Sequence, residues 1–96
     1  MQIKYHKIFL KHFQKRIKPK KKLAKKFTER LALRLENPKA AILKDHQLVG
    51  KLSRYRAFSV TGDIRAVYQI EGGIFYLYDI GTHNQVYWQG RTLSAW

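Results

Sequence analysis

The sequence predicts an α+β domain, with an N-terminal helical hairpin packed on a small, mainly antiparallel, twisted β-sheet. Apolar residues recur at every fourth position in the first half of the chain and at every second position in much of the second half. These are the periods of a helix and of a strand. The length of 96 residues suits one domain with one modest core. We therefore expect residues 1–96 to form a single domain, whose tail at 89–96 has mixed polarity and no period.

The first half should form a short strand followed by two helices. Residues 2–5 are a strand candidate, and a helix over residues 7–17 should stop before Pro19, because proline breaks helices. The apolar residues of this helix share one face: Ile8, Phe9, Phe13 and Ile17. The second helix should end near Asn37, because the residue before Pro38 disfavours the helical conformation. Its core stripe comprises Leu23, Phe27, Leu31 and Leu35.

The second half should form three strands over residues 52–60, 63–70 and 74–80. Turns at 61–62 and at Gly72-Gly73 separate them. Since side chains alternate across a sheet, Asp63 and Arg65 should share one face of the middle strand. The apolar residues of that strand point the other way: Ile64, Ala66, Tyr68 and Ile70. The leucine-rich helix would cover this apolar row, which leaves the opposite face free for function.

The charge of the chain points to RNA. It has 20 Lys and Arg against 6 Asp and Glu, a formal net charge of +14, and such a body attracts polyanions. With 45% hydrophobic residues the chain can still fill a core, so the charge does not mark a disordered tail. We expect contacts with RNA or the ribosome from Lys18, Lys20, Lys21, Lys22, Lys25, Lys26, Lys51, Arg54 and Arg56. The plain alternative for the lysine run is a solvated helix face.

Several classes of protein are disfavoured by what the sequence lacks. There is no cysteine, hence no disulfide and no thiolate zinc site, which agrees with a reducing cytoplasm. No run approaches the roughly 18 apolar residues of a membrane span, and charge interrupts the N-terminus too often for a signal peptide. The carboxylates form no D-x-D motif and the histidines no H-E-x-x-H motif. We expect a cytoplasmic protein that uses no metal or cofactor.

Five polar residues in the strand-rich half match the needs of metal-independent RNA cleavage. The reaction removes the proton of a 2′-hydroxyl, stabilises a charged phosphorane and protonates the departing 5′-oxygen, so it needs a base, a cation and an acid. His46 and His83 can carry the protons, since imidazole has an unperturbed pKa of about 6.5. Arg65 suits the phosphate, and Asp63 could orient a histidine or accept the proton. Tyr87 could stack on a base or position it.

Each of these residues also has a purely structural interpretation. His46 could bond a turn carbonyl, and Asp63 could bond its own backbone. Arg65 could form an ion pair across strands with Asp63 or Asp79. Two further histidines are interpreted as ordinary helix-face residues: His6 and His12.

The run from Asp45 to Tyr87, with the helical hairpin before it, resembles the RelE/ParE superfamily of bacterial toxins, and most of all its YafQ-type branch. The resemblance covers nearly the whole chain before Trp88. Its specific segments are His46-x-Leu48-x-Gly50, Tyr55-Arg56, Asp63-Ile64-Arg65-x-x-Tyr68, Gly81-Thr82-His83 and Val86-Tyr87.

This resemblance implies a RelE-like microbial RNase fold and the toxin of a type II toxin-antitoxin system. It implies a ribosome-dependent mRNA endoribonuclease, or mRNA interferase, that inhibits translation. His46, Asp63, His83 and Tyr87 match positions of the YafQ-type catalytic site, and Arg65 matches the strand arginine of other RelE-type toxins. The implied partners are a cognate antitoxin, the ribosome and mRNA, and operator DNA reached through the antitoxin, all in a bacterial cytoplasm.

The chain departs from the YafQ-type pattern at three positions. Ser59 stands where that branch has a second histidine, Ile64 where it has a tryptophan, and Asp79 where it has an arginine. Our hypothesis is that Arg65 compensates for the arginine missing at position 79. Two rival functions stay open: a ParE-like inhibitor of DNA gyrase, against which the two histidines argue, and a non-catalytic basic protein that binds RNA or the ribosome.

Overall fold

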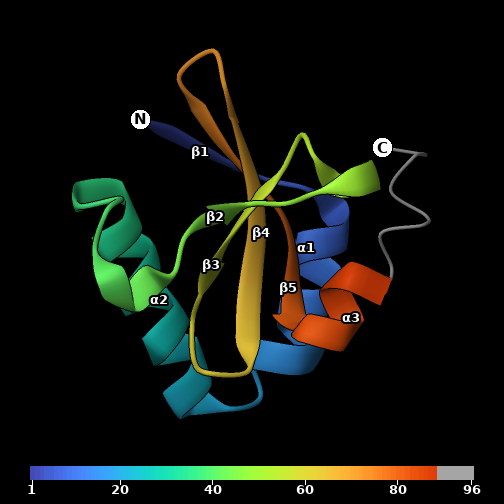
Figure 1. The fold of residues 1–96 in the computed structure, drawn as a ribbon. Helices are drawn as coiled ribbons and strands as arrows, with labels where there is room; N and C mark the ends of the chain where they lie inside the picture. Colours follow the sequence, from blue (N-terminus) through green and yellow to red (C-terminus); the bar gives the residue numbers. More distant parts are fainter. Residues whose placement is uncertain (89–96) are drawn as a thin grey trace.

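The computed structural model describes residues 1–88 of the chain (Figure 1). The tail at 89–96 lies outside the described residues. The helices are α1 (Lys7–His12), which continues as a π-helical turn over Phe13–Ile17, α2 (Lys21–Glu36) and α3 (His83–Trp88). The strands are β1 (Gln2–Tyr5), β2 (His46–Gln47), β3 (Arg56–Ser59), β4 (Ile64–Glu71) and β5 (Ile74–Thr82). In this part of the chain, no helix has the length and apolar character needed to cross a membrane.

The five strands form one sheet in the order β1-β5-β4-β3-β2. β1 runs parallel to β5, and the other three pairs are antiparallel. The glycines at the β4–β5 turn have φ values of +58° and +77°, a left-handed conformation that suits glycine. The predicted α+β class, with a helical hairpin on a mainly antiparallel sheet, is confirmed.

One face of the sheet packs on the helical hairpin and holds the larger hydrophobic core. Phe27 and Leu31 of α2 meet buried side chains of β3, β4 and β5 there. The ring of Phe27 lies 5.6 Å from that of Phe9 and 5.4 Å from that of Phe13, centroid to centroid. The predicted stripe on α2 is wrong at its end, because Leu35 keeps 39% of its surface exposed.

The opposite face is not free, contrary to the expectation from the sequence. It carries a second, smaller core: Leu48, Leu52, Tyr55, Ala57, Val67, Tyr78 and Val86. These side chains come from the loop before β3, from three strands and from α3, which lies across this face (Figure 1). Two layers of apolar contact therefore sandwich the sheet, and any site on this face must lie at the rim of the smaller core.

The start of one strand also differs from the expectation. The strand predicted over residues 52–60 starts only at Arg56, because Gly50–Leu52 forms a 3-10 turn. Gly50 has a φ of +67°, which ends the extended run before it. The short strand β2 and the helix α3 were not predicted from the sequence.

Candidate active site

His46 is held at the sheet edge by the backbone around it. It opens β2 and pairs with Ala57 of β3. Lys44, two residues before this strand segment, has a φ of +47°, which is uncommon for a non-glycine residue. The carbonyl of Lys44 lies 2.9 Å from Nδ1 of His46. Because a carbonyl only accepts, Nδ1 carries the proton in this contact, and Nε2 remains available for chemistry.

His83 and Tyr87 are presented by α3, one helical turn apart. Thr82 and Gln85 cap the start of this helix reciprocally: the Gln85 N–H donates to Thr82 Oγ1 at 3.2 Å, and the Thr82 N–H donates to Gln85 Oε1 at 2.8 Å. This is a capping box, and the spacing Thr-x-x-Gln is its sequence signal. It turns the end of β5 directly into α3, which places both side chains beside the second core.

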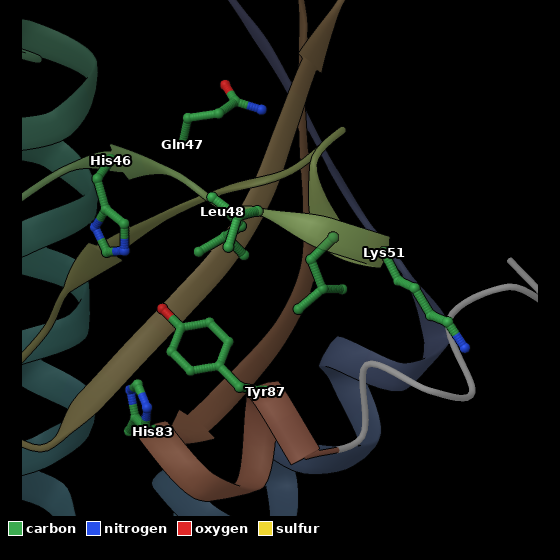
Figure 2. Close-up of a pocket in the computed structure, with 8 residues that line it drawn as sticks. His46, Gln47, Leu48, Lys51, His83 and Tyr87 are labelled. Carbon is green, nitrogen blue, oxygen red and sulfur yellow. The ribbon is translucent and has the colours of Figure 1, made fainter.

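These three residues line one pocket of about 490 Å³. Figure 2 shows the side chain of His46 reaching down from β2 while His83 and Tyr87 face it from α3. The rings of His83 and Tyr87 meet edge to face at 4.3 Å. The remaining lining is largely apolar: Gln47, Leu48, Val49, Lys51 and Leu52. The apolar lining, which the sequence did not indicate, is suited to a flat nucleobase.

The hydroxyl of Tyr87 is a buried donor without a hydrogen-bond partner among residues 1–88. Such groups are rare in native proteins and call for an explanation. Burial raises the pKa of Tyr87, and the positive charge of Arg65 partly offsets this rise. The hydroxyl is thus a neutral donor near the guanidinium of Arg65.

Arg65 faces the same side of the sheet and is anchored by one end. It pairs across strands with Ser59, and its Nη1 donates to Ser59 Oγ at 2.7 Å and to the Thr61 carbonyl at 3.3 Å. A longer contact of 3.4 Å reaches the Gly62 carbonyl. In the described part of the chain Arg65 forms no ion pair, so the alternative of pairing with Asp63 or Asp79 does not occur there. The other guanidinium nitrogens can meet an external anion.

Asp63 does not join these residues. It precedes β4 in the turn, is exposed, and its backbone N–H donates to Thr61 Oγ1 at 3.3 Å. Asp63 is thus a turn residue, but the side chain that bonds the backbone of this turn is the hydroxyl of Thr61 and not the carboxylate of Asp63. None of the contacts described for residues 1–88 connects its carboxylate with His46 or His83, and it does not line their pocket.

Asp45 is a site residue that sequence reasoning missed. Its buried carboxylate accepts from Arg34 Nε at 2.6 Å and from Arg56 Nε at 2.8 Å, and the hydroxyl of Tyr68 donates to it as well. The network ties the residue next to His46 to α2, β3 and β4. Arg56, predicted to contact RNA, is therefore occupied by an internal ion pair. The sequence contains no local signal for this, because the partners are 11 to 23 positions away.

Asp79 is likewise neutralised inside the protein. Its carboxylate lies 2.6 Å from Nδ1 of His12 and 3.8 Å from Nη1 of Arg16. Burial raises the pKa of Asp79, while His12, the Ile80 N–H and Arg16 lower it. His12, interpreted from the sequence as an ordinary helix-face residue, is thus a half-buried hydrogen-bond partner of Asp79. The Asp79 charge is compensated locally and does not cancel that of Arg65.

The basic residues predicted to meet RNA lie mostly at the surface. The lysines at positions 18–26 cover the hairpin turn and the first turns of α2, and all are exposed except the half-buried Lys26. Lys51 lines the pocket and Arg54 is exposed. Within residues 1–88 no group of three or more His, Cys, Asp or Glu side chains is placed to hold a metal ion.

Comparisons with known proteins point to a single family. The family model described as "Bacterial toxin of type II toxin-antitoxin system, YafQ" matches residues 1–87. No curated protein matches the chain at a significant level.

Several solved structures share the fold over almost their full length. YafQ from E. coli strain BL21(DE3) has a TM-score of 0.72 and 26% identity, covering 90% of this chain and 97% of that one. A metal-bound toxin from Helicobacter pylori has a TM-score of 0.70 and 31% identity, covering 90% and 98%. The E. coli DinJ-YafQ complex contains a chain with a TM-score of 0.68 and 26% identity, covering 90% and 97%.

Proposed function

Because this chain belongs to the YafQ family of bacterial toxins from type II toxin-antitoxin systems, we propose that it is a ribosome-dependent endoribonuclease. It cuts mRNA without a metal ion and so inhibits translation. The observation that carries this proposal is the convergence of His46, His83 and Tyr87 on one pocket, with Arg65, which has no ion pair among residues 1–88, near Tyr87. These groups are a pair of proton carriers, a neutral donor and a phosphate ligand.

The proposed reaction is an attack of the 2′-oxygen on the adjacent phosphate. One imidazole takes the 2′-hydroxyl proton, the 2′-oxygen bonds to phosphorus, and the bond to the 5′-oxygen breaks as the other imidazole gives that oxygen a proton. The products are a 2′,3′-cyclic phosphate and a 5′-hydroxyl. Nε2 of His46 is the free nitrogen for its part, because Nδ1 donates to the Lys44 carbonyl.

Two neutral or cationic donors would hold the phosphate during this step. The free guanidinium nitrogens of Arg65 can bind its non-bridging oxygens, and the Tyr87 hydroxyl can donate to one of them, which would satisfy a buried group that lacks a partner among the described residues. Ser59, which stands where the YafQ-type pattern has a histidine, anchors Arg65 at 2.7 Å. The hypothesis that Arg65 supplies the cation missing at Asp79 agrees with this arrangement.

A cognate antitoxin is the proposed protein partner. The E. coli relative forms the DinJ-YafQ complex, and a basic toxin face suits an antitoxin segment that contributes carboxylates. We expect such a segment to cover Arg65 and His83 and thereby displace RNA. Competition binding between antitoxin and RNA measures this directly, and simultaneous binding of both would contradict it.

The test of the proposed function is a map of mRNA 5′ ends after brief expression, with translation running or blocked. Wild type should give cuts at fixed codon positions only while translation runs. His83→Ala should remove these cuts, and Asn84→Ala, which changes an exposed neighbour on the same helix, should keep them. Growth arrest with intact mRNA would reject the nuclease and favour gyrase inhibition or plain ribosome binding.

A further inference from the structure

A second, smaller hollow lies beside the active site. It has a volume of about 150 Å³ and is formed where α2, the loop before β2 and the β3–β4 turn meet. We call it the side groove. Its lining consists of Arg30, Ile42, Lys44, Ser59, Val60, Thr61 and Gly62.

The side groove carries positive charge that the protein does not neutralise. Within residues 1–88 its charged lining residues are Arg30 from α2 and Lys44 from the loop, and no carboxylate of this part of the chain lines it. Among residues 1–88 neither side chain has an ion pair or a hydrogen bond. This differs from Arg16, Arg34 and Arg56, each of which has an internal acid. An unpaired pair of cations in a hollow favours an anionic ligand.

Arg65 forms hydrogen bonds with oxygen atoms of residues that line this groove, which makes the groove more favourable for an anion. The groove is lined by Ser59, Thr61 and Gly62, and the backbone carbonyl oxygens of Thr61 and Gly62 would repel an anion if nothing offset their charge. Arg65 Nη1 donates to an oxygen of each of these residues, at 2.7, 3.3 and 3.4 Å. The guanidinium thus offsets part of the negative charge on these oxygens and adds a third positive charge next to the groove.

The side groove is joined to the active site by two shared residues. Lys44 lines the groove, and its carbonyl accepts from Nδ1 of His46. Ser59 lines the groove and anchors Arg65. We propose that the side groove binds a backbone phosphate of the RNA next to the phosphate that is cleaved, with Arg30 and Lys44 as its ligands. This inference rests on the proposed function, because it takes RNA as the substrate.

The test measures binding separately from cleavage. The probe is a short RNA that is 2′-O-methylated at every position and therefore lacks the attacking hydroxyl. Arg30→Gln/Lys44→Gln should weaken its binding about tenfold, because hydrogen bonds to charged groups are lost, and should lower the slope of log affinity against log salt by about 0.7 per lost phosphate contact. The matched control is Lys4→Gln/Lys7→Gln, which removes the same charge at exposed positions on β1 and at the start of α1 and should change affinity by less than about twofold.

Amide NMR with inorganic phosphate locates the ligand. Phosphate should shift the amides of Lys44 and Gly62 in wild type and in the control, but not in the groove variant. Equal weakening by both double variants, or phosphate shifts confined to other amides, would overturn the proposal. A response of the groove amides to an acidic peptide but not to RNA would overturn it in favour of an antitoxin carboxylate. If wild type binds the methylated RNA through the groove yet cuts no mRNA, the subsite stands and the nuclease proposal fails.

Discussion

The two faces of the sheet differ in how closely their side chains pack and in whether their buried polar groups have partners. On the hairpin face, aromatic rings meet closely, with Tyr68 stacked on Phe75 at 4.4 Å, and the Tyr68 hydroxyl has a partner in Asp45. On the other face, a small core ends in a pocket of about 490 Å³ whose rim includes a buried hydroxyl without a partner among residues 1–88. Hollows and unpaired polar groups cost stability. The comparison indicates that the hairpin face supplies stability while the other face is shaped for a ligand.

The largest expected effect is a loss of cleavage rate from a substitution on the pocket face, with no change in the stability of the fold. His46→Ala removes one proposed proton carrier, and we expect the cleavage rate to fall by about 10²–10⁴-fold, the usual contribution of general acid–base catalysis. His46 is exposed, so the free energy of unfolding, measured by urea denaturation, should change by less than about 0.5 kcal/mol. Single-turnover cleavage on programmed ribosomes provides the rate. Loss of rate together with loss of fold would show that the two faces are not separable in this way.

Two alanine substitutions, one in each core, compare how much each face of the sheet contributes to the free energy of unfolding. Phe27→Ala removes a ring that packs on Phe9 and Phe13 and should cost about 3–5 kcal/mol. Leu52→Ala should cost about 2 kcal/mol, at the low end of the leucine range, because this residue already borders the pocket and leaves less new cavity. Urea denaturation of both variants measures the difference. Equal costs would mean that the smaller core is as tightly packed as the larger one.

The hairpin face is also the part that the sequence predicts well. Leu23, Phe27 and Leu31 are spaced by four; the structure places Phe27 and Leu31 in the larger core and packs the half-buried Leu23 against it. Periodicity works here because one regular element packs on another. It fails for Leu35, which lies in the last turn of α2 and remains 39% exposed, since a period does not say where the partner surface ends.

The pocket face is built from short pieces that no period reveals. β2 has two residues and α3 has six, and both depend on tertiary contacts. The capping box at Thr82 and Gln85 was a readable signal for α3, whereas the Asp45 network joins residues far apart in sequence. His46, His83 and Tyr87 were found by residue type and resemblance, and the structure brings them to one pocket; the carboxylate of Asp63 stays outside it.

The Asp45 network allows a test of how the two faces are linked. Asp45→Asn removes the acid from two arginines and should cost about 3 kcal/mol, the low end for breaking a buried pair, because Arg56 keeps 39% of its side chain exposed. The same change at the exposed Asp63 should cost less than about 0.5 kcal/mol. Urea denaturation compares them. A small effect at Asp45 would mean that its partners find water or other acceptors once the charge is removed.

The smallest expected effect is a loss of unfolding free energy at alkaline pH, which arises from one buried tyrosine in each core. Burial, and the hydrogen bond to Asp45, raise the pKa of Tyr68 to about 12, and burial, with the nearby Tyr55 and Asp79, raises that of Tyr78 to about 12. The unfolded chain loses these protons near pH 10, whereas the folded chain keeps them. Both tyrosines therefore stabilise the fold fully below pH 10, and this contribution is lost as the pH rises from 10 toward 12.

Tyr68→Phe and Tyr78→Phe separate the two contributions to this alkaline loss. Each should make the fall in unfolding free energy above pH 10 shallower, by about 1 kcal/mol at pH 11. Urea denaturation between pH 9 and 11 measures the slope, which is insensitive to any constant change in stability that the substitution causes. Tyr68 lies in the core of the hairpin face and Tyr78 in the smaller core. If the pocket admits water to the smaller core, Tyr78→Phe will change the slope less than Tyr68→Phe; equal changes would show that the pocket stops short of Tyr78.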